Sequence, residues 1–270
     1  MNSKIFPFKL IIRISKLFSK KNRNILRELT RSEFKLTDHN SILGISWSFI
    51  NPSLTLLVMY FIFKGRFGQK FYAYPLYLLI GIITVNFFIS ATSASIKVFS
   101  SNRDIVLNTT SPRELLILSQ LFVHTYKFII ELVICLVLSL FYGIFSPIFI
   151  LLLLPLLLSY LFLIASFGFL LSTVYCFARD IEYIWVLTSR LLFFVTPVFY
   201  KLNYTSPSFR NAIYWGNPIT PFLTSFYEII MNSGSFRLSN YLYALLLGFI
   251  FFVFGYFIFL VIENSTVERA

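Results

Sequence analysis

Charged side chains are scarce in this sequence of 270 residues, because Asp, Glu, Lys and Arg make up only 13% of it, whereas soluble domains carry roughly a quarter. This scarcity argues against a soluble globular protein. Intrinsic disorder is excluded as well, since a disordered chain has low hydrophobicity and this one is 57% hydrophobic and 20% aromatic, with a mean hydropathy of +0.79. The composition therefore predicts an all-α polytopic membrane protein.

Residue types that carry catalysis or bind metals are also rare. Only two cysteines and two histidines are present. Cys135 and Cys176 lie in apolar runs, which favours buried small side chains over a disulfide or a metal site. No His-Glu-x-x-His, Cys-x-x-Cys or Gly-x-Ser-x-Gly motif occurs, and the stretch Gly65–Lys70 lacks the Gly-Lys-Ser/Thr ending of a phosphate-binding loop. We expect no catalytic residue, no metal site and no cofactor on this chain, so a nucleotide that drives it would bind another chain.

Long stretches without charge indicate six membrane crossings, since about 20 apolar residues span the hydrocarbon core. Residues 40–63 and 71–96 carry no charged side chain, and neither does the run from Leu132 to Ala178. The last run is long enough for a helical hairpin that turns at Gly143–Pro147. The spans are expected near residues 45–63, 75–94, 116–141, 148–175, 184–200 and 241–262, in a transmembrane domain at 45–262 that lies between a segment at 1–44 and a tail at 263–270.

The distribution of basic residues predicts the orientation, because Lys and Arg gather in cytoplasmic loops. A cytoplasmic N-terminus puts 15 of the 23 Lys and Arg residues in cytoplasmic segments and six in outer loops, while Lys127 and Arg190 lie within spans. We therefore expect both termini on the cytoplasmic side of the membrane. The net charge of +12 fits contact with anionic lipid headgroups.

The first 44 residues differ from a cleavable signal peptide, because Lys9, Arg13 and Lys16 interrupt the apolar run that one requires. Apolar residues recur among Lys and Arg at helical spacing, which is typical of amphipathic helices lying in the cytoplasmic headgroup zone; they are Ile5, Phe8, Ile12, Ile25, Leu26 and Leu29. The alternative, an arm that binds nucleic acid, is disfavoured. We expect membrane lipids and no nucleic acid as partners of this segment.

A further helix is expected in the outer segment between the fifth and sixth spans. Asn217 and Pro218 are typical of a helix start, and Asn232–Gly234 ends the pattern. Apolar residues recur between them every three or four positions, at Ile219, Phe222, Leu223, Phe226, Ile229 and Ile230. A helix this short cannot span the bilayer. It lies on the surface or re-enters the membrane where protein shields it.

Three charges fall within predicted spans, where an unpaired charge costs at least about 2.5 kcal/mol and usually faces protein or water. Lys127 and Glu131 share one helix face. They form either a self-neutralising pair in the bundle interior or the polar lining of a path; a proton relay is a weaker third interpretation. Arg190 either extends toward the cytoplasmic headgroups or meets a phosphate group of a substrate.

Two aromatic stripes are candidates for a substrate channel, because aromatic faces stack on sugar rings. At helical spacing, one runs along the first span and the other along the fifth: Phe49, Pro52, Tyr60 and Phe63, and then Arg190, Phe193, Pro197 and Tyr200. With 53 aromatic residues in the chain, such stripes also arise by chance. Asn51–Pro52 is expected to kink the first span, a device that suits a gate but also occurs in static bundles.

The order of four motifs resembles the membrane permeases of ABC exporters for polysaccharides, the O-antigen, capsule and teichoic acid exporters. The first motif runs from Ser41 to Pro52 (Ser-Ile-Leu-Gly-Ile-Ser-Trp-Ser-Phe-Ile-Asn-Pro) and the second is Ser-Pro-Arg-Glu-Leu-Leu from Ser111. The third combines Arg179–Ile181 with Leu191–Tyr200, and the fourth is Asn-Pro-Ile-Thr from Asn217. The resemblance covers most of the chain.

This resemblance implies a homodimer of six-span subunits in a bacterial plasma (inner) membrane. The dimer would bind two copies of a cytoplasmic ABC ATPase, which holds ATP and Mg. The dimer would export a lipid-linked glycan through a channel lined mainly by the first and fifth spans. The loop that carries Arg103, Asp104, Pro112, Arg113 and Glu114 resembles the element that couples to the ATPase. The helix that carries Asn217, Pro218, Phe222 and Phe226 resembles an outer gate. Thr37–His39 stands where many members carry basic and aromatic residues.

Two other functions are compatible with parts of the pattern. An ABC-type exporter of a drug or lipid amphiphile would share the fold and would favour a closed apolar vestibule over a wet aromatic channel. A membrane enzyme acting on lipid-linked sugars is disfavoured, because the sequence offers no acid–base or metal cluster.

Overall fold

The computed structural model describes residues 19–38, 47–67, 73–109, 111–144, 148–202, 205–231 and 236–267. Throughout these ranges the regular structure is helical, with no β-strand. The helices are α2 (Lys20–Asp38), α3 (Trp47–Phe67), α4 (Tyr74–Ile96), α5 (Val98–Ser101), α6 (Arg103–Asn108), α7 (Glu114–Phe141), α8 (Ile148–Phe177), α9 (Ile181–Val195), α10 (Pro207–Gly216), α11 (Thr220–Ile230) and α12 (Leu238–Val267).

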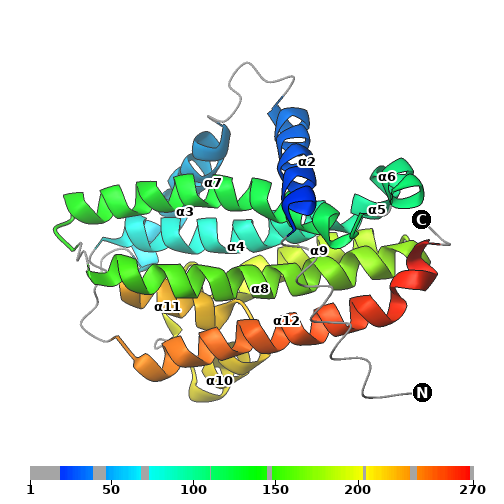
Figure 1. Cartoon of the computed structure of the whole chain (residues 1–270). Helices are drawn as coiled ribbons and strands as arrows, with labels where there is room; N and C mark the ends of the chain where they lie inside the picture. The colour runs from blue at the N-terminus through cyan, green and yellow to red at the C-terminus, as the bar shows by residue number, and fades with distance from the viewer. Residues whose placement is uncertain are drawn as a thin grey trace.

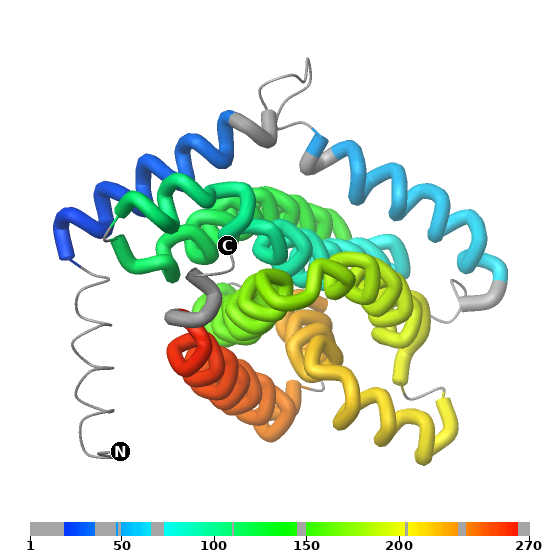
Figure 2. The backbone as a smooth tube through the Cα atoms, turned by 90° about the vertical axis from the view of Figure 1, so that its right-hand side faces the viewer, coloured from blue at the N-terminus to red at the C-terminus, as the bar shows by residue number. Residues whose placement is uncertain are grey.

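Four of the described helices, α4, α7, α8 and α12, are long and apolar enough to cross a membrane. They run side by side in Figure 1, and Figure 2 views them nearly end-on. The predicted all-α membrane architecture is therefore confirmed. The other two expected spans correspond to α3, whose apolar part is Ile50–Gly65, and to α9, which has 15 residues.

Helix α4 forms the centre of the bundle. The apolar window that makes it a candidate span is 78% buried, against 28% to 44% for those of α7, α8 and α12, and it packs against α3, α7, α8, α9 and α11. Its Thr84 carbonyl accepts a hydrogen bond of 2.9 Å from the hydroxyl of Tyr160 on α8. Because these five helices pack against α4, this helix connects the parts of the bundle to one another.

Helices α8 and α12 approach each other closely through small residues. Gly248 lies against Ser159, and Gly255 lies against Ser166, with no room for a Cβ at either glycine. The Ser159 hydroxyl donates to the Leu245 carbonyl at 2.9 Å. Small residues that allow backbones to touch and hydroxyls that bond across the interface are typical of helix pairs within membranes.

The fifth expected span is shorter than predicted. Helix α9 ends at Val195, and Thr196 is extended, with φ −65° and ψ 137°. Pro197 causes this ending, because the residue before a proline avoids the helical conformation. The Thr196 hydroxyl then accepts a 2.8 Å hydrogen bond from the Asn217 amide. The predicted helical stripe through Arg190, Phe193, Pro197 and Tyr200 is therefore wrong beyond Val195.

The outer segment contains two helices where the sequence predicted one. Helix α11 begins at Thr220 rather than at Asn217, whose side-chain oxygen accepts a 3.0 Å hydrogen bond from the Ile219 amide just before it. Nearly every residue of α11 is buried, and the helix packs against α4, α7, α8 and α12, in agreement with a short element shielded by protein. Helix α10 precedes it and was not predicted.

Helix α2 is the described part of the amphipathic segment predicted at 1–44. It runs steeply across the long helices (Figure 1) and packs against α7, where Phe34 and Tyr126 make an edge-to-face contact with ring centroids 5.4 Å apart. Residues 1–18 and 39–46, with the apolar positions Ile5, Phe8 and Ile12, lie outside the described residues. At the other end, α12 continues to Val267, so most of the tail expected at 263–270 is helical.

Candidate functional site

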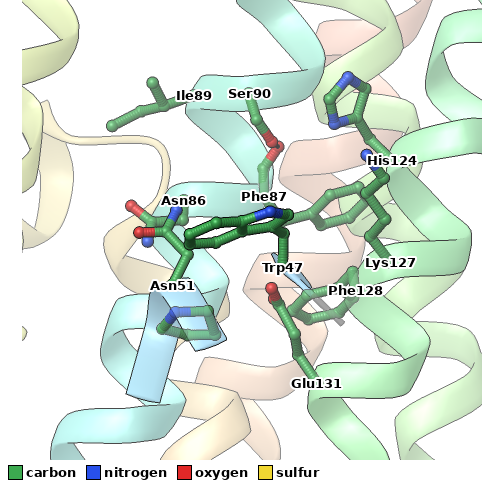
Figure 3. Close-up of a pocket in the computed structure, with 11 residues that line it drawn as sticks. Trp47, Asn51, Asn86, Phe87, Ile89, Ser90, His124, Lys127, Phe128 and Glu131 are labelled. Carbon is green, nitrogen blue, oxygen red and sulfur yellow. Dashed lines mark hydrogen bonds between the residues drawn. The ribbon is translucent and has the colours of Figure 1, made fainter. Parts of the chain in front are cut away.

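A polar cavity of about 550 Å³ lies between α3, α4 and α7. Its polar lining comes from all three helices and its walls include three aromatic rings (Figure 3). The lining residues are Trp47, Asn51, Pro52, Asn86, Phe87, Ile89, Ser90, His124, Lys127, Phe128 and Glu131. A volume of this size is in the range of pockets that hold small ligands.

The two charged groups of this cavity are not in direct contact. Within the described part of the chain, Lys127 and Glu131 form no ion pair with each other, although they lie one turn apart on α7. Figure 3 shows Lys127 beside His124 and the Glu131 carboxylate beneath Trp47. The expected pair is therefore not formed as a direct ion pair, and both side chains contribute to the polar lining, the second of the two interpretations.

Two stacked rings form one wall of the cavity and connect it to the core. Phe87 of α4 and Phe128 of α7 have centroids 4.5 Å apart and an interplanar angle of 10°. Both are buried, and Phe128 also meets Phe226 of α11 edge to face at 6.0 Å. Because packed rings fix this wall, the polar side chains project from a rigid support.

The predicted channel aromatics come together in part, in an aromatic cluster formed by α3, α4, α9, α11 and the chain after α9. Phe63 stacks on Phe199 at 4.9 Å, and Phe193 meets Phe199 edge to face at 5.6 Å. The Tyr74 hydroxyl donates to the Phe199 carbonyl at 3.3 Å and links these rings to further tyrosines. The tyrosines of the cluster, which contact one another, are Tyr60, Tyr74, Tyr77, Tyr200 and Tyr227. The cluster therefore joins the two predicted stripes through a residue that neither stripe included.

The other two channel candidates lie apart from this cluster. Arg190 is exposed on α9, on a face that carries exposed Leu187, Leu191 and Phe194. Phe49 falls within α3, but its side chain lies outside the described residues. Their proposed contacts with a substrate stay predictions.

The predicted coupling loop folds as the short helices α5 and α6 followed by the start of α7. Arg103 and Asp104 are exposed on α6, as is Leu107, at 50%. These three side chains form a surface that a partner could contact. Ile25 and Leu29 of α2 lie against Ile105 and Val106 of α6 and against the start of α7, around a small cavity, so α2 supports this element directly.

Arg113 and Glu114 are turned inward rather than toward a partner. Arg113 forms an ion pair of 2.9 Å with Glu263 of α12, and Glu114 is fully buried and accepts a 3.1 Å hydrogen bond from the Tyr256 hydroxyl. We call these four residues the clamp. Pro112 is half-buried just before it. Any role of Arg113 and Glu114 in coupling would therefore act through α12, not through direct contact.

A second ion pair joins the end of α4 to the start of α9. Lys97, directly after α4, binds Glu182 in the first turn of α9 at 2.7 Å, with both side chains partly exposed. This hydrogen-bonded carboxylate raises the pKa of Lys97 above its ordinary value.

The outer-gate candidates are part of the protein interior. Phe222 and Phe226 are fully buried and contact Tyr160 of α8 at centroid distances of 4.9 and 6.0 Å. Asn217 is buried in its bond to Thr196, and Pro218 is half-buried. The residues anchor α11 in the bundle, and their action as a gate stays a prediction.

Sequence reasoning missed several groups in these sites. Asn86, Ser90 and His124 line the cavity, and Glu263 and Tyr256 complete the clamp. His124 precedes Lys127 by three residues, so helical spacing alone could have placed both with Glu131. Nothing in the sequence links α12 to the start of α7, because 142 to 150 residues separate the partners.

Comparison with known proteins identifies the family of this arrangement. Residues 25–231 match the ABC-2 type transporter family. The chain belongs to this family. An O-antigen export system permease protein RfbA of Klebsiella pneumoniae is 27% identical over 240 residues, which cover 87% of this chain and 91% of that protein. Another of that name from Myxococcus xanthus is 26% identical over 208 residues, 77% of this chain and 80% of its own length.

The ABC-2 family match spans the cavity, the aromatic cluster, the α6 surface and α11, and it excludes the clamp residues of α12. Family membership makes the chain a membrane subunit of a transporter. Together with its bacterial relatives and four long apolar helices, it places the chain as a multi-pass protein of a bacterial inner membrane.

Proposed function

We propose that this chain is the permease subunit of an ABC exporter that moves a lipid-linked polysaccharide, such as an O-antigen, capsule or teichoic-acid-like polymer, across the plasma membrane. The observation that carries this proposal is the similarity, over 77% to 87% of the chain, to relatives named as O-antigen export permeases. The polar, aromatic-walled cavity at the middle of α4 and α7 supports it, because a hydrophilic polymer requires polar groups and stacking surfaces on its way through lipid.

The proposed assembly is a homodimer of six-span subunits with both termini in the cytoplasm. In it α3 and α9 complete the six crossings. Both carry exposed large apolar side chains, including Leu57 and Phe61 on α3 and Leu187 and Leu191 on α9, which supports a second subunit or lipid against these faces. The aromatic cluster and Arg190 would border the path between the two subunits.

The proposed energy source is a separate cytoplasmic ABC ATPase in two copies, which holds ATP and Mg, while this chain carries neither catalytic residues nor a cofactor. The exposed side chains of α6 support this docking place. Because α6 packs against α5 and borders α2 and the start of α7 around a small cavity, closure of the ATPase would push on the bundle at this end. Rigid-body motion of two subunits about their interface would then open the path.

Depletion of this protein in its native cell tests the proposed substrate. We expect surface polysaccharide to fall while lipid-linked polymer accumulates inside, both measured on extracted glycans. Unchanged pools would refute polysaccharide export. Efflux of a small amphiphile would then be the leading function, measured as retention of a fluorescent amphiphile in depleted cells.

Reversal of the charges on α6 tests the docking place. We expect the double substitution Arg103→Glu and Asp104→Lys to reduce copurification of the ATPase and its transport-stimulated hydrolysis. The matched control reverses Arg23 and Glu28, which are exposed on α2. If the α6 variant still binds the ATPase fully, the docking surface lies elsewhere.

A further inference from the structure

The cavity between α3, α4 and α7 lies deep within the membrane-spanning part of the bundle. Lys127 comes 13 residues after the first residue of α7 and Asn86 comes 12 residues after that of α4, which at 1.5 Å per residue is roughly 20 Å along each helix. A hydrocarbon core of about 30 Å has its middle near this depth. Trp47, the first residue of α3, is half-exposed at the same place.

The groups around this cavity are complementary to a phosphorylated sugar. The Lys127 ammonium, the His124 ring and the amides of Asn51 and Asn86 offer donors, as phosphate oxygens require. On the opposite side the Glu131 carboxylate offers acceptors for sugar hydroxyls, and the Trp47 ring above it offers a face for stacking (Figure 3).

No contact within the described residues gives the polar groups of this cavity a structural role. Within the described residues, Lys127, Glu131, His124 and Asn86 have no side-chain hydrogen bond or ion pair. A charged side chain at the bilayer centre costs at least about 2.5 kcal/mol unless water or a bound group solvates it. A ligand with both phosphate and hydroxyl groups would solvate both charges together.

The surroundings of the cavity favour a ligand with a lipid tail. On α7 the exposed side chains nearest the cavity include Ile129 and Val133, at 44% and 50% exposure, whereas Tyr126 contacts Phe34 of α2. The two apolar residues face away from the bundle beside the polar lining, so a tail can lie along α7 while its head group occupies the cavity.

We propose that this cavity binds the sugar-phosphate head group of a lipid-linked substrate, with Lys127 and His124 at the phosphate, Glu131 at sugar hydroxyls and Trp47 stacked on the sugar ring. The proposal rests on the proposed function, to which it adds a place of lipid-side recognition. This place is separate from the aromatic cluster, which shares no residue with it.

Trp47 provides a direct measurement of binding. The chain has three tryptophans; Trp185 is buried on α9 and Trp215 is exposed on α10, so Trp185→Phe with Trp215→Phe leaves Trp47 as the only reporter. The full-length chain in lipid nanodiscs is titrated with a short-chain isoprenyl diphosphate sugar, with a neutral alkyl glycoside and with inorganic phosphate. We expect a saturable change in Trp47 emission with the first probe only.

Substitutions at Lys127 test the assigned contact. Since hydrogen bonds to charged groups contribute about 1.5–3 kcal/mol, we expect Lys127→Met to weaken binding of the isoprenyl diphosphate sugar at least about tenfold. Lys127→Arg should stay within about threefold of the parent, because it keeps the charge and the donors. Arg237→Gln, which removes an exposed cation far along the chain before α12, is the matched control and should bind as the parent does.

Each other outcome overturns part of the proposal. Equal affinity for the alkyl glycoside, or unchanged binding by Lys127→Met, would refute the assigned contact between Lys127 and the phosphate. Equal affinity for inorganic phosphate removes the lipid tail as the means of access. If the double tryptophan variant does not fold, the same Lys127 series is measured by competition against a radiolabelled probe on the native chain.

The export assay separates this proposal from the proposed function. If depletion shows polysaccharide export but Lys127→Met exports at the parent rate and binds normally, the cavity assignment fails and the function stands. If depletion leaves all glycan pools unchanged while the probe still binds at Trp47, the function fails and the site stands.

Discussion

Helix α7 carries two sets of charges with opposite surroundings. At its start, Arg113 and Glu114 meet Glu263 and Tyr256 of α12 in the clamp. Halfway along the same helix, Lys127 and Glu131 meet no such partners and border a cavity. The two carboxylates of the clamp are buried, while Lys127 and Glu131 are half-buried, so the two sets differ in exposure as well as in partners.

The difference shows how structural and functional charges are told apart in a membrane bundle. A buried charge with a matched partner fixes two helices to each other, and removing one partner leaves the other uncompensated. A charge without a partner beside a cavity contributes little to the fold and awaits water or a ligand. The two sets should therefore respond in opposite ways to substitution.

The largest effect on stability is expected at the clamp. Glu263→Ala leaves the Arg113 guanidinium partly buried without its carboxylate, which should lower the free energy of unfolding by about 3 kcal/mol. Thermal unfolding of the purified protein in detergent measures this loss, with Glu28→Ala on the exposed surface of α2 as control. Arg113→Glu combined with Glu263→Arg should recover part of the loss; an unchanged melting temperature in Glu263→Ala would show that the clamp does not hold α12.

A smaller loss is expected when the clamp loses only its hydroxyl. Tyr256→Phe removes the 3.1 Å hydrogen bond to the fully buried Glu114, which should cost about 1–3 kcal/mol because a buried acceptor loses a donor. Tyr183→Phe, at a residue 72% exposed on α9, should leave the melting temperature unchanged. If Tyr256→Phe melts at the same temperature as the control Tyr183→Phe, other groups solvate the Glu114 carboxylate and the clamp consists of the ion pair alone.

The clamp charges and the cavity charges of α7 also differ in how far the sequence predicts them. Lys127 and Glu131 could be placed on one helix face and within the membrane from their spacing and the apolar run around them. Whether they pair could not be predicted, because that depends on side-chain direction and on Asn86 and Asn51 from other helices. The clamp could not be predicted at all, since its partners lie 142 to 150 residues apart in the chain and no periodicity relates them.

The residues at which helices end were predicted less accurately than the presence of the helices. The stripe from Arg190 to Tyr200 extended a helical pattern past Pro197, although the proline itself signals the end that Thr196 adopts. Helix α10 begins with Ser206 and Pro207, a pair typical of a helix start. Its weakly apolar sequence and its place between a span and the expected helix at Asn217 concealed it.

The opposite response is expected at the cavity. Lys127→Met replaces an unpartnered cation with an apolar side chain of similar length, which should leave the free energy of unfolding unchanged or raise it by up to about 1 kcal/mol. The same variant should lose export, measured as surface polysaccharide in cells that depend on the variant. A melting temperature several degrees below the parent would show that Lys127 has a structural partner, and the contrast with the clamp would fail.

The smallest effect is expected at the exposed pair of Lys97 and Glu182, whose side chains are 49% and 34% exposed. The carboxylate raises the pKa of Lys97 in the folded protein, so its stabilisation is complete below the ordinary lysine pKa and is lost as the pH rises through the raised value. Because solvent screens the pair, Glu182→Gln should melt only slightly below the parent near neutral pH in moderate salt, and this small difference should disappear as the pH rises through the raised pKa of Lys97. Since exposure screens this pair, a large drop at neutral pH would mean that Glu182 belongs with the clamp as a structural charge, and that partial burial at this end of the bundle is enough to make an ion pair hold helices together.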